Sequence, residues 1–212
     1  MRVFIGVDPR DVVSYNVLRW SIERRSQRPV SITPLILPQL GLKRKGLTEF
    51  TFSRYLVPHL CGYHGKGLFL DSDMLCLGDI GELFDLEFTE AVAVVKGERF
   101  EWPSLMLFNC GECTALTPDY IENDEPQEFQ WGDIAELPGE WNHCVGYDAP
   151  RDDAKLVHYT MGTPHFKERR SCEYAAEWWS EYRSMTAQAS WLEIHGMSVH
   201  RDKVLKELGL GA

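Results

Sequence analysis

The chain has 212 residues, of which 44% are apolar and 25% are charged. This length suits one domain with a sizeable core, and the composition is that of a folded protein rather than a disordered one. The formal net charge of -10 argues against general binding to nucleic acid or to an anionic membrane, because both require a positive field. A small anionic ligand remains compatible with this charge if a metal ion and local basic residues neutralise it.

Neither a transmembrane helix nor a signal peptide is expected from the pattern of apolar residues. No run of about 18 apolar residues occurs, and the short apolar start meets Asp8 almost at once. The six cysteines are scattered along the chain, and several have apolar neighbours, as buried thiols do. Together these features favour a reducing, cytoplasmic location over a disulfide framework.

The first part of the chain predicts a parallel α/β arrangement. Residues 2–7 form an apolar run that stops at Asp8-Pro9, which is typical of a buried strand that ends in a loop. Apolar side chains then recur at helical spacing over residues 11–25. Residues 30–37 are β-branched and extended, and Pro34 indicates a position at a sheet edge. Strand, helix and strand in this order indicate a parallel sheet.

Further elements are expected along the rest of the chain. Strands are predicted at 67–70, 91–95, 104–108 and 155–160. Helices are predicted at 79–84, from 117 onwards, at 171–185 and at 199–208, and an acidic loop at 122–128. No repeat or linker interrupts the pattern, so we expect residues 1–212 to form one domain.

The sequence Asp71-Ser72-Asp73 carries the most chemical information. An uncharged run that ends in two carboxylates places both near the carboxyl edge of a sheet, where open α/β sheets bind ligands. The two carboxylates repel each other unless a hard cation such as Mg2+ or Mn2+ lies between them. The alternative is a solvated acidic turn, because an isolated Asp-x-Asp is common.

The surroundings of this motif resemble the family 8 glycosyltransferases, the group of glycogenin and the lipopolysaccharide galactosyltransferases. Four stretches match family motifs in the right order, namely 52–58, 68–74, 79–84 and 108–111. They correspond to Ser-Arg-aromatic/Leu-x-x-Pro, Tyr/Phe-Leu-Asp-x-Asp, Asp-Ile/Leu-x-x-Leu-aromatic and Phe-Asn-Ser-Gly. The resemblance covers about half of the chain and implies a GT-A type α/β fold, a mixed, mostly parallel sheet with helices on both faces.

A late stretch, residues 155–162, resembles the family's C-terminal His-aromatic-Ser/Thr-Gly motif. The resemblance makes His158 the third protein ligand of a metal ion beside Asp71 and Asp73. Imidazole suits Mn2+ better than Mg2+, so Mn2+ is the expected ion and Mg2+ the alternative. Without the Asp pair, a His at the polar end of a strand is more often a surface or hydrogen-bonded residue.

The chain departs from the family after this histidine. Members have Gly, two residues and Lys-Pro-Trp, with the Lys on the diphosphate, whereas here Met161 precedes Gly162 and no Lys stands at the family's place. Gly162 and Lys167 are the expected contacts of the donor in this stretch, and His165 is the alternative to Lys167.

The nucleotide is expected to bind at the end of the first strand. Val7, Asp8 and Tyr15 resemble the family's start, where a loop and a Tyr meet uracil and ribose, and Ser72 lies within the acidic motif. By the same resemblance Arg54 contacts the diphosphate or ribose, since a fixed guanidinium fork suits phosphate. A surface ion pair for Arg54 and core packing for Tyr15 are the structural alternatives.

The donor sugar is expected to meet a third group of residues. Asn109 and Gly111 fall where family members hydrogen-bond this sugar, and Gln130 matches the Gln of the family's Asp-Gln element. The resemblance therefore assigns catalytic or sugar-binding roles to Asp71, Asp73, Asn109 and Gln130. Phe129 replaces the family's Asp, so the carboxylate expected there is missing or is supplied by Asp133.

Cys110 and Cys113 form a lone C-x-x-C pair. They could be a redox pair, or half of a zinc site completed by His143 and Cys144. There is no second C-x-x-C and no thioredoxin-like context. Buried or incidental thiols are therefore the favoured interpretation.

The predicted function is transfer of a hexose from a nucleotide-diphosphate sugar, UDP-linked by resemblance, to an acceptor hydroxyl. A metal ion on Asp71, Asp73 and His158 would bridge the diphosphate and stabilise charge on the departing phosphate oxygen. Family members retain the anomeric configuration. The rivals are a catalytically degenerate module that only binds a sugar nucleotide and, less favoured, a nucleotidyltransferase or phosphatase that uses the Asp pair.

Overall fold

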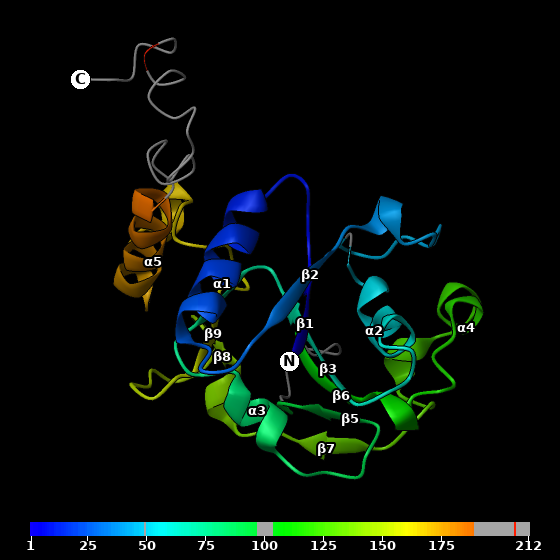
Figure 1. Cartoon of the computed structure of the whole chain (residues 1–212). Coiled ribbons are helices and arrows are strands. Elements are labelled where there is room, and N and C mark those ends of the chain that lie inside the picture. The colour runs from blue at the N-terminus through cyan, green and yellow to red at the C-terminus, as the bar shows by residue number, and fades with distance from the viewer. Residues whose placement is uncertain (49, 97–103, 189–205, 207–212) are drawn as a thin grey trace.

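The computed structural model describes residues 1–48, 50–96, 104–188 and 206. Its centre is a six-stranded sheet in the order β2-β1-β3-β6-β5-β7 (Figure 1). The strands of this sheet are β1 (Arg2–Gly6), β2 (Ser31–Leu35), β3 (Lys66–Asp71), β5 (Val92–Val94), β6 (Leu105–Asn109) and β7 (Ile134–Glu136). The pairs β1·β2, β1·β3 and β5·β7 are parallel, and only β6 runs antiparallel to its neighbours β3 and β5. The prediction of a mixed, mostly parallel sheet is confirmed.

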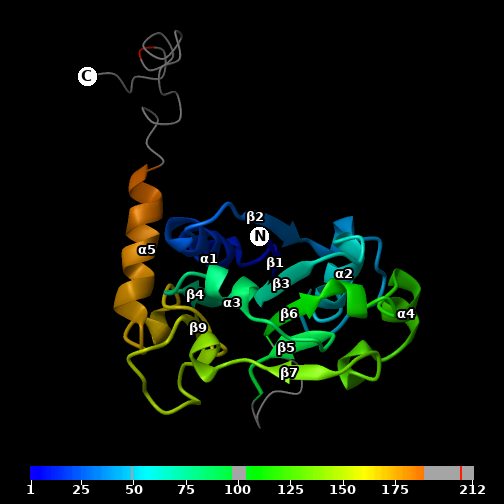
Figure 2. The same ribbon diagram turned by 60° about the horizontal axis from the view of Figure 1, so that its bottom comes forward.

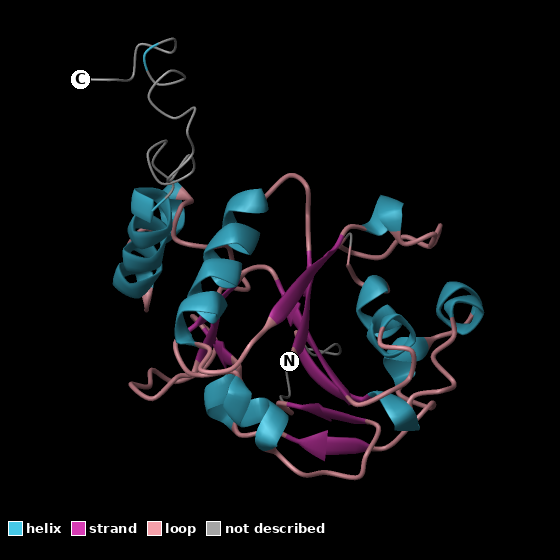
Figure 3. Ribbon diagram, viewed as in Figure 1, coloured by secondary structure: helices cyan, strands magenta, loops and turns pink. Residues whose placement is uncertain are grey.

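Helices cover both faces of this sheet, as predicted (Figure 3). Alternate residues of a strand point to opposite faces, and β1 shows this directly. Val3 and Ile5 pack in one core cluster with residues of α1 (Val12–Arg25) and α3 (Gly81–Asp85). Phe4 packs in a second cluster with residues of α2 (Val57–Leu60) and α4 (Pro118–Asn123).

A second, three-stranded sheet lies beside the first, under α1 (Figure 2). Its order is β4 (Met74–Cys76), β9 (Leu156–His158) and β8 (His143–Cys144). The helix α5 (Ala175–Gln188) inserts the fully buried ring of Trp178 into a cluster with residues of α1, β4 and β9. Arg24 and Arg25 of α1 both form ion pairs with the buried Glu181 of α5, which fastens the two helices together.

The structure differs from the sequence prediction in several elements. The short strands β4, β7 and β8 were not predicted, because two or three residues carry too little periodicity. α5 begins at Ala175 rather than 171, and Tyr174 just before it has a φ of 57°, which is outside the helical region. The helix predicted at 199–208 lies outside the described residues. Across the described part of the chain, no helix combines the length and the apolar character needed to span a membrane.

Candidate active site

The Asp71-Ser72-Asp73 motif lies where β3 ends and the chain turns into β4. Asp71 is the last residue of β3, and Met74 begins β4. The parallel neighbour β1 ends at the same level, because Gly6 pairs with Asp71. Both carboxylates therefore lie at the carboxyl edge of the parallel strands, as the sequence predicts.

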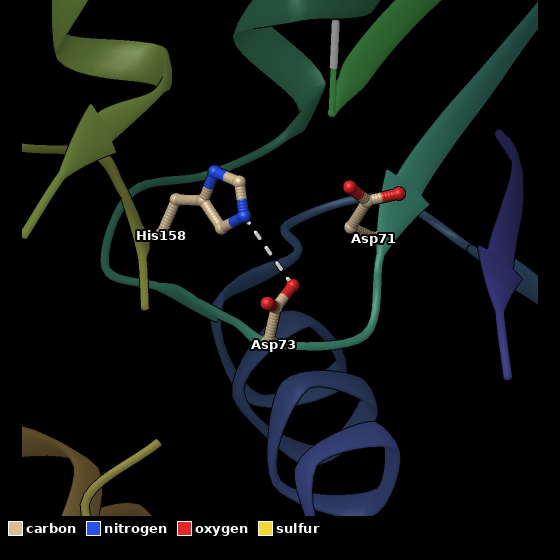
Figure 4. Close-up of side chains that lie close together, drawn as sticks. All are labelled: Asp71, Asp73 and His158. Atoms are coloured by element: carbon tan, nitrogen blue, oxygen red, sulfur yellow. Dashed lines mark ion pairs between the residues drawn. The ribbon is translucent and has the colours of Figure 1, made fainter. Parts of the chain in front are cut away.

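His158 reaches the same place from the second sheet. β9 runs antiparallel to β4 with Met74 opposite His158, and the backbone N–H of Tyr159 donates to the carbonyl oxygen of Asp73 at 2.9 Å. This pairing points the imidazole at the acidic turn, where Nε2 lies 3.4 Å from Oδ1 of Asp73 (Figure 4). One ligand atom from each of Asp71, Asp73 and His158 lies within 4.8 Å of the other two.

Arg54 is a buried partner of Asp71 rather than a surface residue. It lies in the short 3-10 helix Ser53–Leu56 and is 4% exposed. Its guanidinium donates to Oδ1 of Asp71 at 3.1 Å and lies 4.8 Å from the centre of the Phe69 ring. The predicted alternative of a surface ion pair is wrong, because this pair is enclosed by the core. A donor contact of Arg54 remains a prediction.

The pKa values of Asp71 and His158 are both raised above their ordinary values. Burial and the neighbouring Asp73 together raise the pKa of Asp71 to about 6, against the opposing effects of Arg54 and His158. Burial lowers the pKa of His158, but the Asp73 carboxylate outweighs burial and raises that pKa to about 10. Without an ion, a proton on His158 offsets one of the two negative charges of the Asp pair, and Arg54 offsets the other.

The residues present fit a divalent cation. Oδ1 of Asp73 is buried and forms no hydrogen bond of normal geometry, although it faces the imidazole. Two carboxylates and an imidazole nitrogen form a donor set that suits Mn2+ or Mg2+, with the nitrogen favouring Mn2+. In the described part of the chain, this is the one group of three or more His, Cys, Asp and Glu side chains with such spacing.

Two further side chains lie beside the far nitrogen of His158, and a third contacts one of them; the sequence predicted no such contact. Nδ1 lies 3.0 Å from Oγ of Ser104 and 3.8 Å from Sγ of Cys144. The Ser104 hydroxyl donates to Oδ1 of Asn142 at 3.2 Å. These residues come from the start of β6, from β8 and from the turn before β8. No sequence motif marks Ser104, and no role was predicted for Asn142, which follows Trp141 in the sequence.

The residues after β1 line the same edge of the sheet. Val7 is buried beyond Gly6, while Asp8 is half-buried and forms an ion pair with Arg10, which lowers the pKa of Asp8. Tyr15 packs partly against the core that α1 covers, and Ser72 is 5% exposed between the two Asp. Their predicted contacts with the donor remain predictions.

The predicted positions of Asn109, Gly111 and Gln130 at the donor sugar are corrected by the strand directions. β6 runs antiparallel to β3, so Asn109 lies opposite Lys66, at the other end of β3 from Asp71. Five strand residues separate those ends by roughly 16 Å. Gly111 follows Asn109 at that far edge, and the exposed Gln130 precedes β7 there, hydrogen-bonded to Glu128. Asp133 lies on the same side, and its carbonyl accepts from Ala91 at the start of β5.

Some residues of the loop after β9 contact the rest of the fold, and others are exposed. Gly162 has a φ of 104°, and its N–H donates to the Tyr159 carbonyl. His165 contacts Oγ1 of Thr163 at 2.7 Å and lies 3.8 Å from Asp11 at the start of α1. Lys167 is exposed, so of the two candidates for the diphosphate contact Lys167 has the freer side chain.

The cysteines form neither a disulfide nor the proposed zinc site. All six are free thiols. Cys110 and Cys113 are buried, and the sulfur of Cys113 lies 3.1 Å from the Ala91 carbonyl oxygen. His143 and Cys144 belong to β8 in the other sheet, so the zinc interpretation is wrong. Burial of both thiols agrees with the favoured interpretation.

A pocket of about 240 Å³ lies beside the second sheet. It is lined by residues that follow β8 and β9 and by the segment before α5: Val145, Gly146, Tyr159, Met161, Gly162, Arg169, Cys172 and Glu173. The N–H of Val145, a residue of the pocket wall, donates to the His158 carbonyl at 3.0 Å.

Comparison with known proteins identifies the family. Residues 21–130 match the family described as Glycosyl transferase family 8. Protein CDI from Arabidopsis thaliana is 36% identical over 222 aligned positions, which cover 85% of this chain and 85% of that protein. The chain belongs to glycosyl transferase family 8.

Solved structures confirm the GT-A type fold. The galactosyltransferase LgtC, solved in complex with donor and acceptor sugar analogs, superposes with a TM-score of 0.61 at 11% identity over 88% of this chain and 96% of LgtC. The glycosyltransferase GlyE of Streptococcus pneumoniae gives 0.62 at 18% identity over 88% of this chain. The bifunctional WbbM gives 0.65 at 17% identity over 92% of this chain. This chain spans 63% of the length of GlyE and 50% of WbbM.

Proposed function

We propose that this family 8 protein is a Mn2+-dependent hexosyltransferase that uses a UDP-linked sugar and transfers the hexose to an acceptor hydroxyl. One observation carries the proposal. Asp71 and Asp73 from one turn, and His158 from a strand far along the sequence, offer ligand atoms within 4.8 Å of one another at the carboxyl edge of the sheet. Two acidic groups this close require a cation before a diphosphate can approach.

Each residue of the site has a distinct task in this proposal. Asp71 and Asp73 hold the ion with their carboxylates, and His158 completes the set with Nε2. Arg54 fixes the Asp71 carboxylate from behind and keeps it ionised despite its burial. A bound divalent cation supplies Lewis-acid stabilisation of the negative charge on the leaving diphosphate.

In this proposal the nucleoside binds at the large sheet and the acceptor binds beside the second sheet. The end of β1, with Val7 and Asp8, offers backbone and side-chain groups for the nucleoside on the side of the large sheet. The pocket lined by Val145, Tyr159 and Met161 is our proposed acceptor site, because two of these residues directly follow the strands β8 and β9, of which β9 carries His158. The exposed Met161 lines this pocket, so Met161→Glu is expected to raise KM for the acceptor more than KM for the donor.

Family membership also supports retention of the anomeric configuration, which NMR of the product would reveal directly. The catalytically degenerate alternative predicts nucleotide binding without turnover. A reducing compartment such as the cytoplasm is our proposed location, supported by six free thiols.

Donor hydrolysis tests the proposed function without knowledge of the acceptor. The purified protein is incubated with a panel of UDP-sugars in Mn2+ or in chelator, and released UDP is measured. We expect UDP release in Mn2+ that is lost in chelator and in Asp73→Asn. Asn123→Asp, on the exposed end of α4, is a control that adds a charge away from the site. Binding of UDP-sugars with no release under any condition would favour the degenerate module.

A further inference from the structure

The imidazole of His158 must hold its proton on one particular nitrogen if it is to bind a cation. A neutral imidazole carries one proton, and only the other nitrogen has a lone pair for a metal. Nε2 faces Asp73, whereas Nδ1 points away from the acidic turn. Ligation through Nε2 therefore requires a group beside Nδ1 that accepts a hydrogen bond.

Ser104 is that group by distance and by burial. Its Oγ lies 3.0 Å from Nδ1, and the residue is 5% exposed. The second neighbour of Nδ1, Sγ of Cys144, is at 3.8 Å, and sulfur is a weak acceptor. The serine hydroxyl has one proton and can either donate to Nδ1 or accept from it, so the direction depends on where that proton goes.

Asn142 decides the direction. Its Oδ1 lies 3.2 Å from Oγ of Ser104 and can only accept. The Ser104 proton is therefore directed to Asn142, and the lone pairs of Oγ face His158. The hydrogen bond then runs from Nδ1–H of His158 to Ser104 and from Ser104 to Asn142, which leaves the Nε2 lone pair towards Asp71 and Asp73.

The backbone of Ser104 adds a second link to the same site. Its carbonyl oxygen accepts from the N–H of Asp71 at 2.9 Å. One residue at the start of β6 thus holds Asp71 of β3 through its main chain and His158 of β9 through its side chain. Ser104 joins the two sheets at the point where their metal ligands meet.

We propose that Ser104 and Asn142 are positioning residues that fix His158 as the Nδ1–H tautomer, so that Nε2 is the metal-binding nitrogen. The inference rests on the proposed metal site but concerns two residues that do not themselves touch the ion. Partners of this kind orient metal-binding histidines in many proteins, and their loss weakens the metal site without removing a ligand.

The test is Mn2+ affinity in the absence of nucleotide, measured by titration with electron paramagnetic resonance of free Mn2+. Ser104→Ala is expected to weaken binding about tenfold or more, the range typical of groups that orient a ligand. Ser104→Thr keeps the hydroxyl and should bind close to the wild type. Cys144→Ala removes the other neighbour of Nδ1 and is the matched control, which should also stay close to the wild type.

The tautomer itself is read from the 15N shifts of His158 in protein loaded with Mg2+, a diamagnetic ion. The wild type should show a protonated Nδ1 and a lone pair on Nε2. Asn142→Leu removes the final acceptor and should broaden or split the 15N signals of His158. It also provides a second variant if Ser104→Ala does not fold.

The two ways of failing are distinguishable. Wild-type protein that binds no Mn2+ would overturn the metal site and the proposed function with it. Tight Mn2+ binding that Ser104→Ala leaves unchanged, or a proton on Nε2 in the Mg2+ form, would overturn the role of Ser104 and Asn142 alone.

Discussion

Replacing Arg54 by Met removes the positive charge that faces Asp71 while keeping an apolar stem in the core. The two side chains are 5% and 13% exposed, and their charged atoms lie 3.1 Å apart. At a pH where the remaining carboxyl group stays ionised, breaking a buried pair by removing one partner costs about 3–5 kcal/mol, because that charge has no compensation. For 212 residues at about 2.1 cal/mol/K each, this corresponds to a melting temperature lower by roughly 7–11 °C.

The Asp71 carboxyl group responds to the same change. Its pKa is already raised to about 6 with Arg54 in place, so loss of Arg54 raises it further and protonates Asp71 near neutral pH. Arg54→Met should therefore also weaken Mn2+ binding. In Arg54→Met/Asp71→Asn both charges are absent, and most of the lost stability should return. Thermal melts of the three proteins in chelator are the assay. A single variant within about 1 kcal/mol of the wild type, or a double variant as unstable as the single one, would refute the electrostatic argument.

Three further predictions concern other parts of the account. In chelator, the raised pKa of His158 should make the fold most stable below pH 6.5 and less stable as pH rises towards 10. Thermal melts across this range should show a melting temperature that depends less on pH in His158→Gln than in the wild type. A wild-type melting temperature that does not change with pH would contradict the pairing with Asp73. Asn109→Ala and Gly111→Ala should leave donor hydrolysis unchanged, because both residues lie at the far sheet edge; lost turnover in folded protein would restore them to the site. Gly67→Ala should cost about 1–3 kcal/mol by overpacking, since its Cβ would lie 2.7 Å from Cγ1 of Val57; unchanged Mn2+ affinity would show that the effect is confined to packing.

Five of the six strands of the large sheet were predictable because they carry clear signals, and only the short edge strand β7 was missed. The buried run that ends at Asp71 and the strand–helix–strand opening both fix local structure through periodicity. The second sheet was not, because β8 has two residues and β4 three, and each is defined only by its pairing with β9. Such pairing depends on contacts distant in sequence, which local propensity does not encode.

The proposed metal ligands were predictable from the sequence, whereas the residues that contact them from behind were not. Asp71, Asp73 and His158 stand in motifs whose residue types match their chemistry. Asn109 also stands in a motif-like stretch, but the sequence does not reveal the direction of β6. Because β6 pairs antiparallel with β3, Asn109 lies at the edge of the sheet opposite the one that carries Asp71. The same antiparallel pairing places Ser104 at the edge of the sheet that carries Asp71. A single serine before an apolar strand matches no motif, so the sequence does not predict a role for it.

The central claim is that one ion joins Asp71, Asp73 and His158. Crystals grown with Mn2+ and UDP, measured at the manganese absorption edge, test it most directly. We expect one anomalous peak with Nε2 of His158 and oxygens of both Asp71 and Asp73 within about 2.0–2.3 Å, and the diphosphate on its open side. UDP bound with no anomalous peak at these residues, or a peak whose ligands exclude His158, would contradict the account.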